Sequence, residues 1–126
     1  MELLMIEMVE TYICLSNYDK QLVLHNILHD VKYGKDVNAL RAKYDLTSEI
    51  TRYMPDNLQD LCVLATYIEQ AFVNRFEEPP DWVYDERLYL PVPYFGLFKS
   101  PEIVFFAPQA CYRHNVFFRA SAFEVV

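Results

Sequence analysis

Proline is distributed unevenly along this chain of 126 residues, and its placement limits where long helices can form. Six of the seven prolines lie in residues 79–108. Proline fixes φ and removes the amide hydrogen that an interior helical turn needs, so this stretch cannot hold a long helix. Long helices are therefore expected only before about residue 77, where Pro55 is the single proline.

The apolar residues before residue 77 recur at helical spacing. In residues 18–33 they occur at i, i+3, i+4 and i+7, and in residues 58–75 they form the clearest apolar stripe of the chain. Shorter helices are expected over residues 2–15, 36–44 and 47–54.

Polar residues and one glycine mark the expected helix ends. Ser16 and Asp36 are suited to cap the helices that follow them, because their side-chain oxygens can accept hydrogen bonds from free amides. Gly34 stands where a helix commonly ends. Asp56 with Gln59 resembles a capping box at the start of the longest stripe.

The tail is expected to cover the helices as an aromatic-rich layer. "YLPVPYF" (89–95) indicates extended chain, whereas residues 102–106 fit either a buried strand or one helical turn, because five residues show no clear period. Asn115 can satisfy backbone groups in an irregular buried segment. The residues expected to form this hydrophobic clasp are Trp82, Pro93, Tyr94, Phe95, Pro108, Asn115 and Phe117.

These patterns predict a mainly α fold: a small helical bundle with an irregular C-terminal wrap rich in proline and aromatic residues. A chain of 126 residues is the length of one domain. We expect a single domain over residues 1–126, with the helical scaffold over about 2–76 and the wrap over about 77–126.

Glycine and cysteine usage excludes several classes of site. The two glycines stand far apart, so no glycine-rich phosphate loop is present. The three cysteines form no CxxC pair, which argues against a structural zinc site. The start "MELLMIEMVE" is acidic where a signal peptide would be basic, and no apolar run approaches the ~20 residues of a spanning helix. We expect a soluble, cytoplasmic protein that holds no cofactor or metal and does not enter a membrane.

Two pairs of side chains have a spacing that suits a chemical site. His25 and His29 are four residues apart, a spacing that suits a metal pair, but no third ligand is evident. Cys111 and His114 are three apart and would form a thiolate nucleophile if the ring reached the sulfur. No orienting carboxylate or oxyanion hole accompanies them, so a small Cys/His enzyme is the least favoured function and no catalytic residue is assigned.

Negative charge is concentrated in the middle of the chain. The net charge is −7, and residues 53–86 contain eight acids against one base, Arg75. Such a field attracts basic partners and repels nucleic acid phosphates. The acids expected to contact a basic protein partner are Asp56, Asp60, Glu69, Glu77, Glu78, Asp81, Asp85 and Glu86.

A helix-turn-helix over residues 36–54 is the alternative. A short helix, a turn at Asp45 and a second helix opened by threonine would place hydroxyl and basic groups against DNA. The second helix is short and the following helix is acidic, so DNA binding is disfavoured. The residues that would contact DNA are Arg41, Lys43, Thr47 and Arg52.

The last fifty residues resemble the tail of a family of small bacterial proteins without an assigned activity. The matching motifs are "PPDWV" (79–83), "YLPVPYF" (89–95) and "APQACYRHNVFFRASAFEVV" (107–126). Cys111 and His114 replace a phenylalanine and an arginine of the family pattern, which argues against a required nucleophile. The family pattern matches at Pro80, Trp82, Leu90, Pro93, Tyr94, Phe95, Pro108, Asn115, Val116, Phe117, Phe123 and Val126.

Some members of this family are encoded beside nucleotidyltransferase-type toxins, so the resemblance implies an antitoxin-like or accessory role. Together with the acidic charge, it favours a non-enzymatic module for protein–protein interaction. The sequence leaves the partner's identity and the oligomeric state open.

Overall fold

The first part of the chain folds into helices, as the apolar spacing predicts. The computed structural model describes residues 2–96 and 99–125, with side chains from Met8 onward. The prediction of a mainly α fold is confirmed. The helices before the tail are α1 (Glu2–Ile13), α2 (Asn17–Tyr33), α3 (Val37–Lys43), α4 (Thr47–Arg52) and α5 (Leu58–Asn74).

The tail contains only short elements, and prolines begin three of them. Pro80 and Pro108 stand directly before helical turns, and Pro101 is the first residue of one, where its missing amide hydrogen is not needed. Residues 102–106, left open between strand and helix, belong to a helical turn. The tail elements are the 3-10 turn η1 (Asp81–Tyr84), β1 (Tyr94–Phe95), α6 (Pro101–Phe105), α7 (Gln109–His114), β2 (Val116–Phe117) and the 3-10 turn η2 (Ala120–Phe123).

The side-chain caps are partly as predicted. The Ser16 side chain accepts a hydrogen bond from the amide of Asp19, and Asp36 accepts bonds from the second and third amides of α3. The prediction of a capping box by Asp56 and Gln59 is wrong. Helix α5 starts after Asn57, and no side chain caps it.

Gly34 ends α2 at the predicted position but for a different physical reason. Its φ is −65°, so the left-handed conformation usual for such a glycine is absent. A Cβ at this position would lie 2.7 Å from the side chain of Leu40 and 2.9 Å from the carbonyl oxygen of Asp30. Glycine is favoured here because a Cβ would crowd the α2 backbone at Asp30 as well as the Leu40 side chain of α3.

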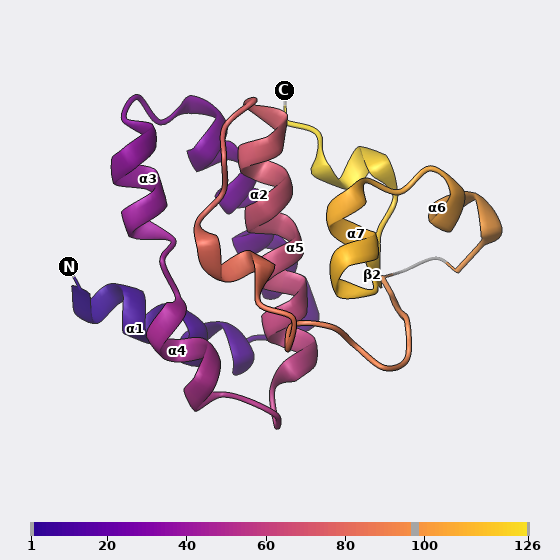
Figure 1. Ribbon diagram of the computed structural model, residues 1–126, viewed down its shortest axis with the longest axis horizontal. Coiled ribbons are helices and arrows are strands. Elements are labelled where there is room, and N and C mark those ends of the chain that lie inside the picture. Colours follow the sequence, from indigo (N-terminus) through magenta and orange to yellow (C-terminus); the bar gives the residue numbers. More distant parts are fainter. Residues whose placement is uncertain (1, 97–98, 126) are drawn as a thin grey trace.

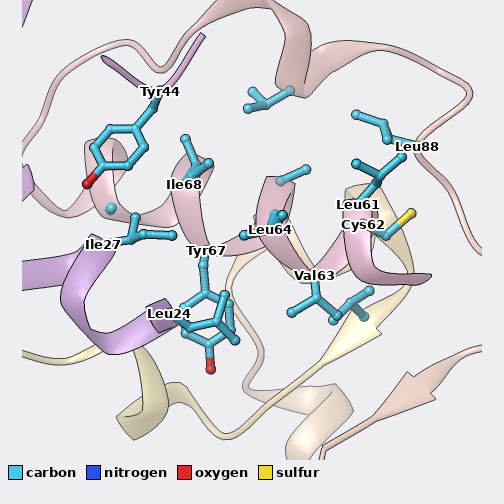
Figure 2. Close-up of a cluster of buried hydrophobic side chains, with 14 of the residues drawn as sticks. Leu24, Ile27, Tyr44, Leu61, Cys62, Val63, Leu64, Tyr67, Ile68 and Leu88 are labelled. Carbon is cyan, nitrogen blue, oxygen red and sulfur yellow. The ribbon is translucent and has the colours of Figure 1, made fainter. Parts of the chain in front are cut away.

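Helix α5 is the centre of the fold. In Figure 1, α1, α3 and α4 lie to the left of α5, α2 passes behind it, and the tail elements α6 and α7 lie to its right. Its main packing partners are α2 and α7. Every residue of α5 from Leu61 to Glu69 is buried, as expected for a helix covered on all sides. Figure 2 shows Leu64 and Ile68 of α5 packed beside Leu24 and Ile27 of α2.

The tail strands pair in parallel and close the clasp. Tyr94 pairs with Val116, and Phe95 pairs with Phe117, on which its ring also stacks with centroids 5.6 Å apart. Asn115 stands between α7 and β2 in the left-handed region, with φ 60° and ψ 39°. Its side-chain amide donates to the carbonyl oxygen of Leu90 at 2.8 Å, and its own carbonyl accepts from the amide of Tyr94.

The remaining clasp residues differ in burial. Trp82 and Phe117 are each 5% exposed, and the Trp82 indole donates to the carbonyl oxygen of Tyr44 at 2.7 Å. Pro108 is half-buried. Pro93 is exposed, so its assignment to the clasp is wrong: it lies in the bend before β1, with its ring turned to solvent.

Candidate functional site

Residues 76–89 connect α5 to the tail and return along one side of α5 (Figure 1). Three contacts fix this path: the Trp82 indole bonds to the end of α3, the Arg87 guanidinium reaches Thr51 of α4 at 3.4 Å, and the carbonyl of Leu88 accepts from a side chain of α7. We call residues 76–89 the docking segment.

Buried and exposed residues are interleaved along the docking segment. Trp82, Val83 and Leu88 are buried and hold it against the helices. Tyr84 follows Val83 and Tyr89 follows Leu88, and these two tyrosines are 42% and 51% exposed. The segment therefore exposes aromatic rings to solvent on a backbone that its buried residues hold against the helices.

Phe76 opens the docking segment in an unusual conformation. Its φ is 62°, and its side chain is 97% exposed. The amide of Glu77 donates to the carbonyl of Phe72, and that of Phe76 to the carbonyl of Val73, so this is the left-handed position that ends a helix and usually holds glycine. A bulky ring is thus held in a strained backbone while it gains no burial.

The predicted acidic strip is much less continuous than the sequence suggests. Four of its eight acids are neutralised by a basic side chain within the chain. The ion pairs are Asp60 with Lys20, Glu69 with Arg113, Glu77 with Arg41, and Asp85 with Arg87.

The prediction that Glu69 contacts a partner protein is wrong. Glu69 is 3% exposed, on the face of α5 covered by α7 and the docking segment, so it cannot contact a partner protein. Of the other acids, Glu78, Asp81 and Glu86 are exposed on the docking segment, and the described residues offer them no ion pair. Asp56 is exposed in the turn before α5, outside the segment.

Glu69 instead belongs to a buried polar cluster with Arg113 and His114. Its two carboxylate oxygens lie 3.1 and 3.0 Å from Nε of Arg113, and Oε1 lies 3.2 Å from Nε2 of His114. Nδ1 of His114 lies 2.7 Å from the carbonyl oxygen of Leu88, and the guanidinium of Arg113 stacks on the Tyr84 ring at 4.7 Å. Arg113 of α7 therefore forms its ion pair with Glu69 of α5.

The protons of this cluster follow from its geometry. A carbonyl oxygen only accepts, so Nδ1 of His114 must donate to Leu88. Nε2 faces Oε1 of Glu69, and the same carboxylate accepts hydrogen bonds from Nε of Arg113. Both nitrogens of the fully buried imidazole are engaged, so the ring has none free to act as a general base.

The Cys/His alternative has no support from this geometry. The Cys111 thiol is buried, and this burial raises its pKa to about 11, so the reactive thiolate is disfavoured at neutral pH. His114 is turned toward Glu69 and Leu88. His25 and His29 are exposed on α2, and within residues 2–96 and 99–125 no three His, Cys, Asp or Glu side chains gather as metal ligands would.

The proposed DNA-contacting residues lie on α3 and α4 but are largely engaged. Arg41 donates to Glu77, Lys43 pairs with Asp30 at 2.7 Å, and Thr47 donates to Asp45. Arg52 lies over its neighbouring tyrosine ring. The acidic docking segment also contacts both helices, which opposes binding to phosphates.

Comparison with protein-family models, with curated proteins and with solved structures gave no match. Among the described residues, none of the helices combines the length and the apolar character needed to cross a lipid bilayer.

Sequence reasoning missed the two features that define this site. An acid stands at position 69, inside the apolar stripe of α5, and that pattern was a usable signal of a buried carboxylate. Phe76 had no such signal, because its exposure follows from the way α5 ends.

Proposed function

We propose that this protein is a non-enzymatic interaction module that binds a partner protein with a basic surface through the docking segment. The observation that carries the proposal is Phe76, a ring 97% exposed on a backbone with φ 62°. Backbone strain of this kind is kept where function requires it. The described residues bury almost none of the ring, so contact with another molecule explains its presence.

The chemistry of the docking segment suits a basic protein surface. Phe76, Tyr84 and Tyr89 offer aromatic anchors, the residue type on which binding energy concentrates at interfaces. Glu78, Asp81 and Glu86 supply negative charge without an internal ion pair, which speeds and orients encounter with a positive patch.

The buried residues of the docking segment also favour binding, because they fix its backbone before a partner arrives. A segment already fixed by Trp82 and Leu88 loses little conformational entropy when a partner binds. Glu78 is also held by the Tyr84 hydroxyl, which donates to it at 3.4 Å. An acid and an aromatic ring are thereby presented together.

The tail's resemblance supplies the partner class to test first, a nucleotidyltransferase-type toxin encoded by a neighbouring gene. An antitoxin-like protein would cover basic residues of such an enzyme with its acidic surface.

The proposal is tested by co-expression with the products of adjacent genes, followed by affinity purification. Phe76→Ala should reduce recovery of the partner strongly, whereas Phe105→Ala, which removes an exposed ring on α6, should leave it unchanged. Equal recovery with all three proteins, or no association with any neighbouring product at low salt, would refute the proposal.

A further inference from the structure

A second surface feature is independent of the docking segment: a pocket of about 380 Å³ where the end of α1, the start of α2, the start of α5 and β1 meet. This volume lies within the range of small-molecule sites. Tyr18, Tyr94 and Phe118 form its aromatic walls, and Gln59 contributes an amide.

An ion pair lies in the wall of this pocket. Nζ of Lys20 and Oδ1 of Asp60 are 3.0 Å apart, and their side chains are only 18% and 19% exposed. Oδ2 of Asp60 accepts no hydrogen bond from the described residues, and Lys20 lies over the Tyr12 ring at 5.4 Å. The pocket thus presents a strong donor beside a strong acceptor, with no net charge from the pair.

Tyr12 adds a further polar group to the pocket wall. It is 2% exposed and lines the pocket, yet its hydroxyl forms no hydrogen bond within the described part of the chain. Every buried side-chain nitrogen or oxygen of the described residues has a hydrogen-bond partner, so the Tyr12 hydroxyl, which has none, is open to the pocket and can donate to a group bound there. Burial, with the nearby charge of Asp60, raises the pKa of this phenol, so it remains a neutral donor.

We propose that this pocket binds a planar, uncharged nitrogen heterocycle with an N–H donor beside a carbonyl acceptor, the pattern of pyrimidine and purine bases. The base would stack on the aromatic walls, as bases do on aromatic side chains. Lys20 donates to its carbonyl, Asp60 accepts from its N–H, and the Tyr12 hydroxyl completes the polar edge.

The charges of the pocket limit the form of this ligand. Lys20 repels a cation, and Asp60 repels an anion. The whole chain carries a net charge of −7, which further opposes phosphate. A nucleoside or free base therefore fits better than a nucleotide.

The test is an NMR titration of the full chain with uridine and guanosine, with uridine monophosphate as the charged comparison. We expect saturable shifts at Tyr12, Tyr18 and Tyr94, with weaker binding of the monophosphate. Tyr12→Phe, which keeps the ring, should weaken binding about five- to tenfold, the effect of one lost hydrogen bond. Asp60→Asn, which removes the charge of the acceptor, should weaken it as well.

Tyr89→Phe is the matched control, because it removes the hydroxyl of a tyrosine on the docking segment. It should leave nucleoside affinity unchanged, so this test fails or succeeds separately from the proposed protein docking. The inference is overturned by absence of saturable nucleoside binding, by equal affinity of the Tyr12→Phe variant, or by tighter binding of the monophosphate than of uridine.

Discussion

Replacing Phe76 by glycine should stabilise the protein. An L-residue in the left-handed conformation costs about 1–2 kcal/mol, and glycine removes that cost. Glycine also gives the unfolded chain more freedom, which offsets about 0.5–1 kcal/mol of the gain. The Phe76 side chain is 97% exposed, so its removal loses no packing. The expected net change is an increase of about 0.5–1 kcal/mol in the free energy of unfolding.

The assay is urea unfolding followed by fluorescence of Trp82, the single tryptophan, which is buried in the native state. Phe76→Ala is the control, because it removes the ring and keeps the strained φ; its stability should stay within about 0.5 kcal/mol of the parent. If Phe76→Gly lowers stability, or if Phe76→Ala costs more than about 1 kcal/mol, the ring contributes to the fold and the reasoning fails.

Three further predictions concern the core and the clasp. Glu69→Gln should lower the free energy of unfolding by about 3 kcal/mol, because it breaks a buried charge cluster. Glu77→Gln breaks a half-exposed ion pair, so in the same urea experiment it should lower that free energy by less than about 1 kcal/mol. Asn115→Ala should cost about 1 kcal/mol more than Asn115→Gly, since both lose the side-chain hydrogen bond but only alanine is strained at φ 60°; equal losses would contradict this. The core tyrosines Tyr12, Tyr44 and Tyr67 have pKa values raised above 10.0 by burial, so their stabilising effect should be complete below pH 10 and lost as pH rises further; a thermal midpoint unchanged well above pH 10 would refute that sign.

Local features of the sequence predicted much of the fold. The six prolines of residues 79–108 exclude a long helix there whatever the tertiary structure is, because a missing amide hydrogen cannot be compensated within a helix. Ser16 and Asp36 cap their helices through bonds to residues two or three positions away, which a sequence pattern can reveal.

Features that depend on long-range packing could not be predicted in the same way. Glu69 meets His114 across 45 positions of the sequence, so composition alone placed this carboxylate on an acidic surface. At Gly34 a Cβ would crowd the carbonyl of Asp30 and the side chain of Leu40, although the backbone conformation is one that other residues adopt. The exposure of Phe76 likewise depends on the direction in which the chain leaves α5.

The most direct test of the docking proposal is the affinity of the purified partner for a charge-neutralised docking segment, measured over a salt series. The variant Glu78→Gln/Asp81→Asn/Glu86→Gln is compared with a control that removes three exposed acids elsewhere, Glu10→Gln/Asp19→Asn/Glu102→Gln. The docking variant should bind more weakly and with a flatter salt dependence, while the control retains both properties of the parent. Equal affinities and equal salt dependence for the two variants would contradict the assignment of the docking segment.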